Sequence, residues 1–152
     1  VDLPPGRVDI QLTRAQKVRV TGAVVGTTPQ DIALLDARKG FEMFEKVHVT
    51  ALGIVEKMST HVCSSCGHEE PIFGAGGGAR MAAQYRLELL GSLPLDIRIR
   101  EQADGGKPTV VAEPDGRLAQ IYREIARKAA ARLSLRGRSY SGRFPDIVKR
   151  DK

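Results

Sequence analysis

Hydrophobic residues in the first third of the chain follow two different periods. Residues 18–27, VRVTGAVVGT, form a β-branched run typical of a buried strand, and Pro29 then marks the first turn of a helix. Apolar residues recur at helical spacing over 30–46, which predicts an amphipathic helix. These apolar positions are Ile32, Leu35, Phe41 and Phe44. Residues 50–55, TALGIV, predict a second strand, so the order of elements predicts a βαβ unit with a right-handed crossover.

The pattern of elements continues towards the C-terminus. The further predicted elements are a loop over 59–78, helices over 79–85 and 118–133, a strand over 89–93, a helical segment in the stretch PLDIRIREQADGG, and a short extended piece over 108–112, PTVVA. The glycines of 74–78, GAGGG, predict a flexible hinge before a helix. Because strands and helices alternate, we expect the α/β class, with a parallel sheet flanked by helices.

Length and composition limit the classes to which the chain can belong. At 152 residues, 41% hydrophobic and 28% charged, it fits one globular domain. No apolar run approaches the roughly 18 residues of a membrane-spanning helix. The N-terminal sequence VDLPPGRVD has no secretion signal, so we expect a cytoplasmic protein that does not cross a membrane.

Most of the net positive charge lies at the C-terminal end. The formal net charge is +6, and residues 132–152 hold seven Lys or Arg against two Asp, which leaves the rest of the chain nearly neutral. A nucleic-acid interface would require basic residues clustered on one face of the domain. We therefore predict no nucleic-acid binding, and we divide the chain into a domain over 1–135 and a basic tail over 136–152.

Both cysteines lie in the segment 61–71, HVCSSCGHEEP. Cys63 and Cys66 are separated by two residues and can converge on one metal centre, but zinc and iron–sulfur clusters usually take four protein ligands. In a reducing cytosol such a pair is more often a metal or redox site than a structural disulfide. The pair therefore supplies two of the four ligands that such a metal site needs.

Four interpretations of this half site remain open. His61 and His68 could complete a local zinc site, although ligands two residues to either side of a tight turn would strain a tetrahedron. A redox dithiol needs a helix start at the pair, which the residues after Cys66 do not predict. Two unligated loop cysteines are the simplest alternative. A second copy of the chain could also supply the other pair, which would place four thiolates on a two-fold axis.

A nucleotide site is incomplete in this sequence. Asp2, followed by Pro-Pro-Gly, suits a carboxylate near Mg²⁺, and a turn residue before prolines is the alternative. The sequence contains no GxxxxGK followed by Ser or Thr, the loop that cradles phosphates. The GGKP of 105–108 is not such a loop, because proline cannot donate an amide. The chain alone is therefore not expected to bind or hydrolyse ATP well.

A series of motifs, in sequence order, resembles one family. They are VDLPPG with DIQLT, TTPQDIALLDARKG, LGIVEKMS followed by the CxxC and CGH, IFGAGGGARMA, PLDIRIREQADGGKPTVV and YREIARK. Together they resemble the C-terminal half of the Mrp/ApbC proteins, MinD-like P-loop ATPases that act as iron–sulfur cluster carriers. The resemblance covers residue 1 to about residue 133. It implies the C-terminal part of a MinD-like P-loop NTPase fold that lacks the phosphate-loop half.

The resemblance implies a function for the cysteine pair. Cys63 and Cys66 match the family's CxxC, which binds a 4Fe-4S cluster shared across a homodimer. The cluster is handed to apo-proteins, so apo iron–sulfur proteins and cluster scaffold proteins are the expected partners. A stand-alone zinc-binding or interaction module without ATPase activity is the alternative.

The resemblance also implies a nucleotide site. Asp2 matches the Walker B aspartate associated with Mg²⁺, and Asp9 is retained in the turn after it. Pro94 and Asp96 fall in the segment near the adenine. Lys57 stands where the family usually has an Asn that reads the base, and a Lys offers donors only. ATP and Mg²⁺ are therefore expected only when the N-terminal half is present, and whether this chain acts as an enzyme stays open.

Overall fold

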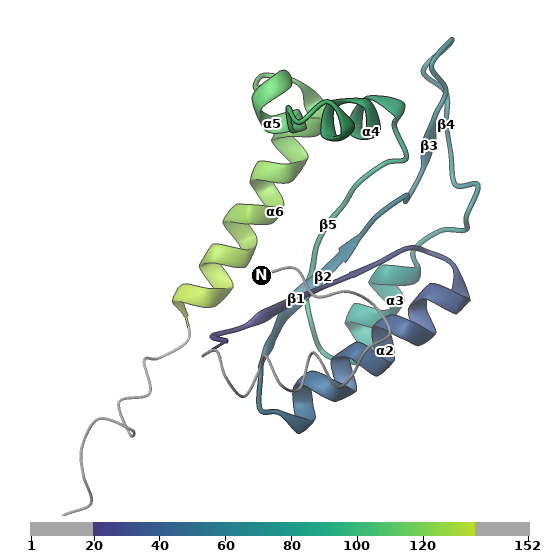
Figure 1. The fold of residues 1–152 in the computed structure, drawn as a ribbon. Coiled ribbons are helices and arrows are strands. Elements are labelled where there is room, and N and C mark those ends of the chain that lie inside the picture. The colour runs from purple at the N-terminus through teal and green to yellow at the C-terminus, as the bar shows by residue number, and fades with distance from the viewer. Residues whose placement is uncertain (1–19, 136–152) are drawn as a thin grey trace, which may run out of the picture.

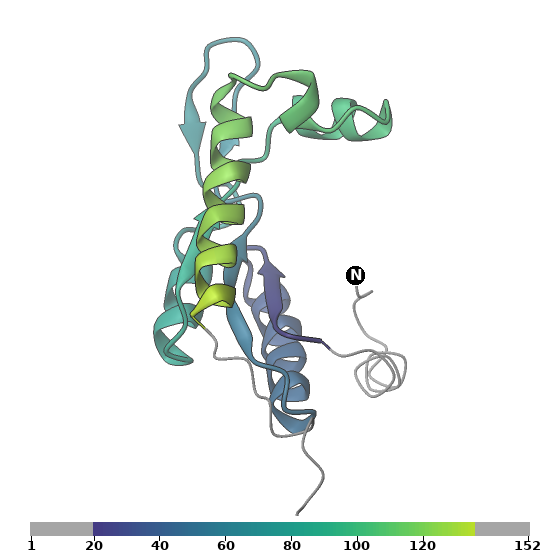
Figure 2. The same ribbon diagram turned by 90° about the vertical axis from the view of Figure 1, so that its left-hand side faces the viewer.

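A parallel sheet lies at the centre of residues 20–135, the part of the chain that the computed structural model describes (Figure 1). Its strands within this range are β1 (Ala23–Thr27), β2 (Ala51–Glu56) and β5 (Leu89–Ser92), in the spatial order β1-β2-β5. Both strand pairs are parallel. Helices α2 (Asp31–Lys46) and α3 (Gly77–Gln84) cover one face, and α6 (Arg117–Ser134) packs on the other (Figure 2). The predicted βαβ unit and parallel sheet are confirmed.

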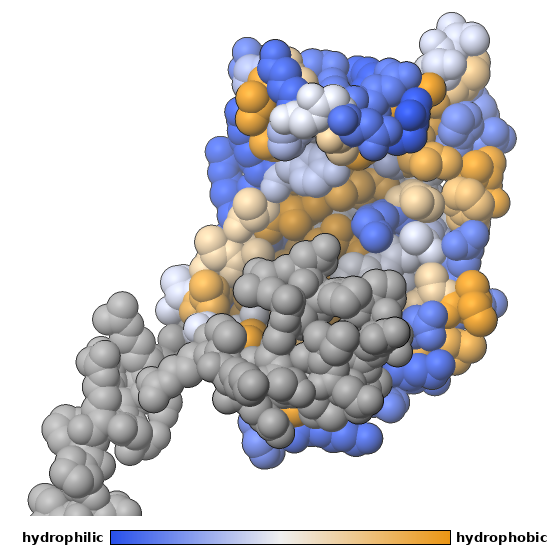
Figure 3. Space-filling view, in the orientation of Figure 1, coloured by the Kyte–Doolittle hydropathy of each residue, from blue (hydrophilic) through white to orange (hydrophobic). Residues whose placement is uncertain are grey.

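Each face of the sheet has its own apolar core. Ile54 of β2, which is 0% exposed, packs with Phe41 of α2 and Met81 of α3 on one side. Its neighbour Val55 points to the other side, where Leu90 and the α6 side chains cover it. The residues of α6 in this second core are Ile121, Tyr122, Ile125 and Ala129. Figure 3 shows a band of apolar surface beside α6. Burial on both faces explains why the central strand β2 is almost continuously hydrophobic.

Glycines allow the layers to approach closely. A Cβ added at Gly53 would lie 2.6 Å from Leu90 Cγ, and one at Gly77 would lie 2.6 Å from the Pro29 carbonyl oxygen. Gly77 and Gly78 are buried at the start of α3. These two glycines of the predicted hinge therefore belong to a close-packed helix start, and Gly74 and Gly76 lie before it with positive φ.

Four shorter elements connect these layers. They are β3 (His61–Val62), β4 (Glu69–Glu70), α4 (Ile97–Asp104) and α5 (Thr109–Ala112). The expected loop over 59–78 thus contains an antiparallel hairpin. The extended piece predicted over 108–112 is wrong, because α5 is a helical turn in which the Pro108 carbonyl accepts from the amides of Val111 and Ala112. None of the described helices is long and apolar enough to cross a membrane.

The helix predicted over 30–46 is confirmed, but its predicted apolar face is only partly buried. Ile32 is 72% exposed and Leu35 is also exposed. The buried residues of α2 are Ala37, Phe41 and Met43. Asp2, Asp9 and the basic tail 136–152 lie outside the described residues.

Candidate functional site

The cysteine pair lies at the end of the hairpin formed by β3 and β4. His61 pairs with Glu70, and Val62 pairs with Glu69. The Cys63 amide donates to the His68 carbonyl at 2.9 Å, and the Gly67 amide donates to the Cys63 carbonyl, also at 2.9 Å. These two bonds close a tight turn, which uses a left-handed Gly67 with φ of 71°. The turn holds both cysteines away from the sheet, at the far end of the hairpin in Figure 1.

The two thiols differ in exposure and in the groups around them. Cys63 is half-buried, Cys66 is exposed, and both are free. The backbone amides of Cys66 and Ser65 donate to the Cys63 sulfur and hold the pKa of this thiol below its usual value. A thiolate is the form that binds a metal, so the turn favours ligation through Cys63. The sequence predicted that no helix begins at the pair, and the structure confirms this. A thioredoxin-like dithiol would need a helix N-terminus at this position to stabilise one thiolate.

The histidines near the pair do not complete a metal site. His61 belongs to β3, where its backbone bridges to Leu95, and its Nδ1 is buried without a hydrogen-bond partner. His68 is exposed. Within residues 20–135, no group of three or more His, Cys, Asp or Glu side chains is placed to hold a metal ion. The described part of one chain therefore offers two thiols as half of a site, and the local zinc site with His61 and His68 is not formed.

Backbone bonds and one ion pair hold the hairpin to the body. Ser59 donates to the Leu93 carbonyl through its amide at 3.0 Å and its hydroxyl at 3.1 Å. The Leu95 amide donates to the Thr60 carbonyl at 2.7 Å. On the return strand, the Glu69 carboxylate accepts from the Arg117 guanidinium of α6, which lowers the pKa of Glu69. The two arms of the hairpin are thus attached to different elements.

The other predicted site residues within the described part of the chain lie where β2 and β5 end. Lys57 follows β2, with its amide donating to the Thr27 carbonyl at 2.7 Å, and Pro94 is buried after β5. Asp96 caps α4, accepting from the Arg98 amide at 2.9 Å. Asp96 also forms an ion pair with the Arg98 side chain at 2.7 Å, which lowers the pKa of Asp96. The structure brings Lys57, Pro94 and Asp96 to one edge of the sheet, where ligands of open α/β folds bind.

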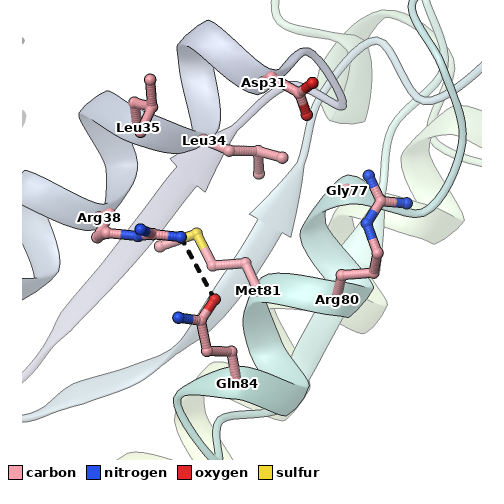
Figure 4. Close-up of a pocket in the computed structure, with 8 residues that line it drawn as sticks. All are labelled: Asp31, Leu34, Leu35, Arg38, Gly77, Arg80, Met81 and Gln84. Atoms are coloured by element: carbon pink, nitrogen blue, oxygen red, sulfur yellow. Dashed lines mark hydrogen bonds between the residues drawn. The ribbon is translucent and has the colours of Figure 1, made fainter.

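A groove of about 410 Å³ lies between α2 and α3, and none of the predicted site residues lines it (Figure 4). Leu34 and Met81 contribute apolar surface, and Arg38 donates to Gln84 across the groove at 3.5 Å. Arg80 is turned to the Ala75 carbonyl, 2.8 Å away. The groove is therefore a surface between two packed helices, separate from the cysteine hairpin.

A buried carboxylate that was not among the predicted site residues lies at the base of the hairpin. Glu56, the last residue of β2, is 4% exposed and accepts a hydrogen bond from the Gly78 amide at 2.5 Å. The signal that could have pointed to it is an acidic residue ending the otherwise apolar strand TALGIVE.

Comparison with known proteins places this arrangement in a family. A family model described as "NUBPL iron-transfer P-loop NTPase" matches residues 1–130. The chain belongs to this family. Among curated members, it is 61% identical to the iron-sulfur cluster carrier protein of Pseudomonas fragi, over 83% of this chain and 44% of that protein. It is 56% identical to the carrier protein of Escherichia coli K12, over 93% and 38%.

The iron-transfer P-loop NTPases also include a mammalian relative. The mouse iron-sulfur cluster transfer protein NUBPL is 47% identical over 88% of this chain and 42% of that protein. The chain thus spans about two fifths of the length of these curated relatives.

Solved structures agree with this assignment. A nucleotide-binding protein from Archaeoglobus fulgidus in complex with ADP is 32% identical, with a TM-score of 0.64 over 79% of this chain and 48% of that one. The cell division ATPase MinD of Pyrococcus furiosus is 22% identical, with a TM-score of 0.55 over 73% and 43%, and supports the fold alone. The chain therefore has the fold of about half of a MinD-like P-loop NTPase.

Proposed function

We propose that this chain is the cluster-binding part of an iron–sulfur cluster carrier. Cys63 and Cys66 from each of two copies hold one 4Fe-4S cluster as cargo, and the homodimer passes it to apo-proteins after a scaffold protein has supplied it. One observation carries this proposal: the described residues offer two free thiols on a projecting hairpin, with no third ligand gathered beside them. Four thiolates, the usual ligand set of such a cluster, then require a second chain.

The names of the relatives support the cargo that we propose. Proteins at 56–61% identity are named iron-sulfur cluster carriers, and the relative from mouse is named an iron-sulfur cluster transfer protein. The geometry of the turn fits this cargo, because backbone amides already face the Cys63 sulfur and favour its thiolate form. We place the carrier in the cytoplasm, with the domain ending near residue 135 and the basic tail beyond it.

Nucleotide binding is the second part of the proposal. Lys57, Pro94 and Asp96 form the adenine side of a site, and Asp2 and Asp9 belong to its Mg²⁺ side. The phosphates need a loop that this sequence does not contain, so we assign ATP and Mg²⁺ to the protein only when an N-terminal half supplies that loop. A related nucleotide-binding protein is described in complex with ADP, which supports nucleotide binding by the longer protein.

The cluster is tested by anaerobic reconstitution with iron and sulfide. We expect absorbance typical of a 4Fe-4S cluster, about four iron atoms per two chains, and a dimer by light scattering. Cys63→Ser removes two of the four thiolates of a shared site, so both the cluster and the cluster-dependent dimer are lost. Ser64→Ala, in the same turn, is the matched control and keeps both.

Two results would contradict the proposal. Zinc bound at one ion per chain, with no uptake of iron, would make the chain a zinc-binding module. A coloured dimer that persists in Cys63→Ser would exclude a cluster shared by four cysteines. ATP turnover is measured separately, with and without the N-terminal half, because the proposal expects turnover only in its presence.

A further inference from the structure

The cysteine hairpin is part of a longer excursion that leaves the sheet and returns to it. Residues 57–76 run from the end of β2 to the start of α3, and both cysteines lie within them. The Glu56 carboxylate accepts from the Gly78 amide at 2.5 Å, and these two residues are 22 positions apart. One hydrogen bond therefore joins the residue before the excursion to the first turn of the helix after it.

Glu56 is bound in a way that fits a fixed anchor. Its side chain is 4% exposed, and a buried carboxylate is costly unless it is hydrogen-bonded. The N-terminus of α3 supplies a backbone N–H and the positive end of a helix dipole, which both favour a negative charge. The bond is thus a charge-assisted one in a region shielded from water.

The surroundings of Gly78 and of Glu56 both favour this contact. A Cβ added at Gly78 would lie 3.0 Å from both Cβ and Oε2 of Glu56, so the helix start can approach only because Gly78 has no side chain. On the strand side, Glu56 pairs with Thr27 of β1 and Ser92 of β5, and its carbonyl accepts from the Leu93 amide at 2.8 Å. The carboxylate therefore extends from a strand that is paired on both sides.

The remaining attachments of the excursion lie further along it. The Ser59 and Thr60 bonds to the segment after β5 hold the outgoing arm, and the Glu69–Arg117 ion pair holds the return arm at the surface. These contacts fix each arm to a neighbour, whereas the Glu56 bond, together with the packing of Met81 of α3 on Ile54 of β2, fixes the distance between the two ends. A cluster shared by two copies requires the thiols of each copy to be held in a defined geometry by the residues that support them.

We propose that Glu56 is a positioning residue for cluster binding: its buried carboxylate closes the base of the excursion, so that the hairpin leaves the sheet in one direction and presents both thiols to a second copy. This inference rests on the proposed function of the cysteine pair. Glu56 itself does not touch the cluster and acts through the Gly78 amide.

The test compares Glu56→Ala and Glu56→Gln with Met81→Ala in the full chain. Met81 is buried on α3 but does not take part in the Glu56 bond, so Met81→Ala controls for general loss of stability. We expect Glu56→Ala to raise amide hydrogen exchange over residues 61–70 of the iron-free protein by about tenfold, with a smaller rise in the sheet. Iron loss to a chelator should accelerate by a similar factor. Glu56→Gln keeps an oxygen acceptor and should restore most of both properties.

The outcomes separate the two proposals. If exchange over 61–70 rises no more in Glu56→Ala than in Met81→Ala at a matched thermal midpoint, the positioning role is overturned. If the wild-type protein takes up no iron, the proposed function fails, while a selective rise in hairpin exchange still supports the anchor. Glu56→Asp, whose shorter side chain withdraws the carboxylate from Gly78, gives the same comparison if Glu56→Ala does not fold.

Discussion

The sheet body and the cysteine hairpin are stabilised in different ways. In the body, Ile54 and Leu90 are almost completely buried between two layers of helices. In the hairpin, Cys66 and both residues of β4 are exposed, and hydrogen bonds and an ion pair replace a core. Fold stability therefore depends on apolar packing in one region, and the proposed chemistry depends on side chains in the other. Substitutions in the two regions should have separable effects.

The largest effect on stability is expected in the body. Ile54→Ala removes a side chain that is 0% exposed and should cost about 2–5 kcal/mol of unfolding free energy, measured by urea denaturation. Ile97→Ala is the matched control on α4, where Ile97 is 53% exposed, and it should change this free energy by less than about 0.5 kcal/mol. Equal losses in the two variants would contradict the contrast between core and surface.

An intermediate effect is expected at Asp96, which joins the end of β5 to α4. Asp96→Ala removes a helix cap and should cost about 1 kcal/mol of unfolding free energy. Asp96→Asn keeps an oxygen that can cap the helix but loses the charge that pairs with Arg98.

The pH dependence of this pair has a defined sign. The Arg98 guanidinium lowers the pKa of Asp96 in the folded protein below the ordinary value of about 3.9. The contribution of the Asp96–Arg98 pair to the free energy of unfolding is therefore complete above the ordinary pKa of about 3.9. It is lost as the pH falls through the lower pKa of Asp96 in the folded protein. The stability difference between wild type and Asp96→Asn should shrink in urea titrations below about pH 4. A difference that grows on acidification would contradict this assignment.

A smaller effect on stability is expected from the cysteines themselves. The double variant Cys63→Ser/Cys66→Ser should unfold at the urea concentration of the wild type, because neither thiol is part of either apolar core. Iron uptake should nevertheless be abolished. A large shift of the midpoint in the iron-free protein would show that the hairpin supports the body.

The sequence predicted the layers of the fold better than their packing. The βαβ unit was predictable because the β-branched strands and the spacing around Phe41 and Phe44 are strong periodic signals. The same spacing placed Ile32 on the buried face, where it does not lie, because α2 packs on the sheet through the side that carries Ala37, Phe41 and Met43. The Val110–Val111 pair favoured an extended piece, but the bonds to the Pro108 carbonyl select a helical turn.

The candidate site was predictable only in part. Cys63 and Cys66 were identified from their spacing, and the structure places them on a turn outside any helix, as expected. The role of Glu56 was not predictable, because it depends on a contact with Gly78 across 22 residues. The contacts of Asp96 were not predictable either. Its motif indicated a nucleotide site, and in the structure its carboxylate contacts Arg98 of α4, the helix that it caps.

The smallest effect is expected at the Glu69–Arg117 ion pair. Arg117→Gln should leave the thermal midpoint unchanged, because exposed ion pairs contribute little to stability. Amide exchange near Glu69 should rise slightly, and added salt should produce the same change in the wild type by screening the pair. Arg117→Lys keeps the charge and should behave like the wild type. A lower thermal midpoint in Arg117→Gln would show that the hairpin and α6 unfold together.

The short distance between the two ends of the excursion has a consequence for how such proteins can diversify. Residues 57–76 leave and re-enter the body at neighbouring points, so the chain between them can change length without moving the sheet. Doubling the length of a flexible loop costs only about 0.6 kcal/mol. We therefore expect that the segment between Glu56 and Gly78 can be replaced, in evolution or by design, with one that carries other metal ligands while the sheet and helices stay the same.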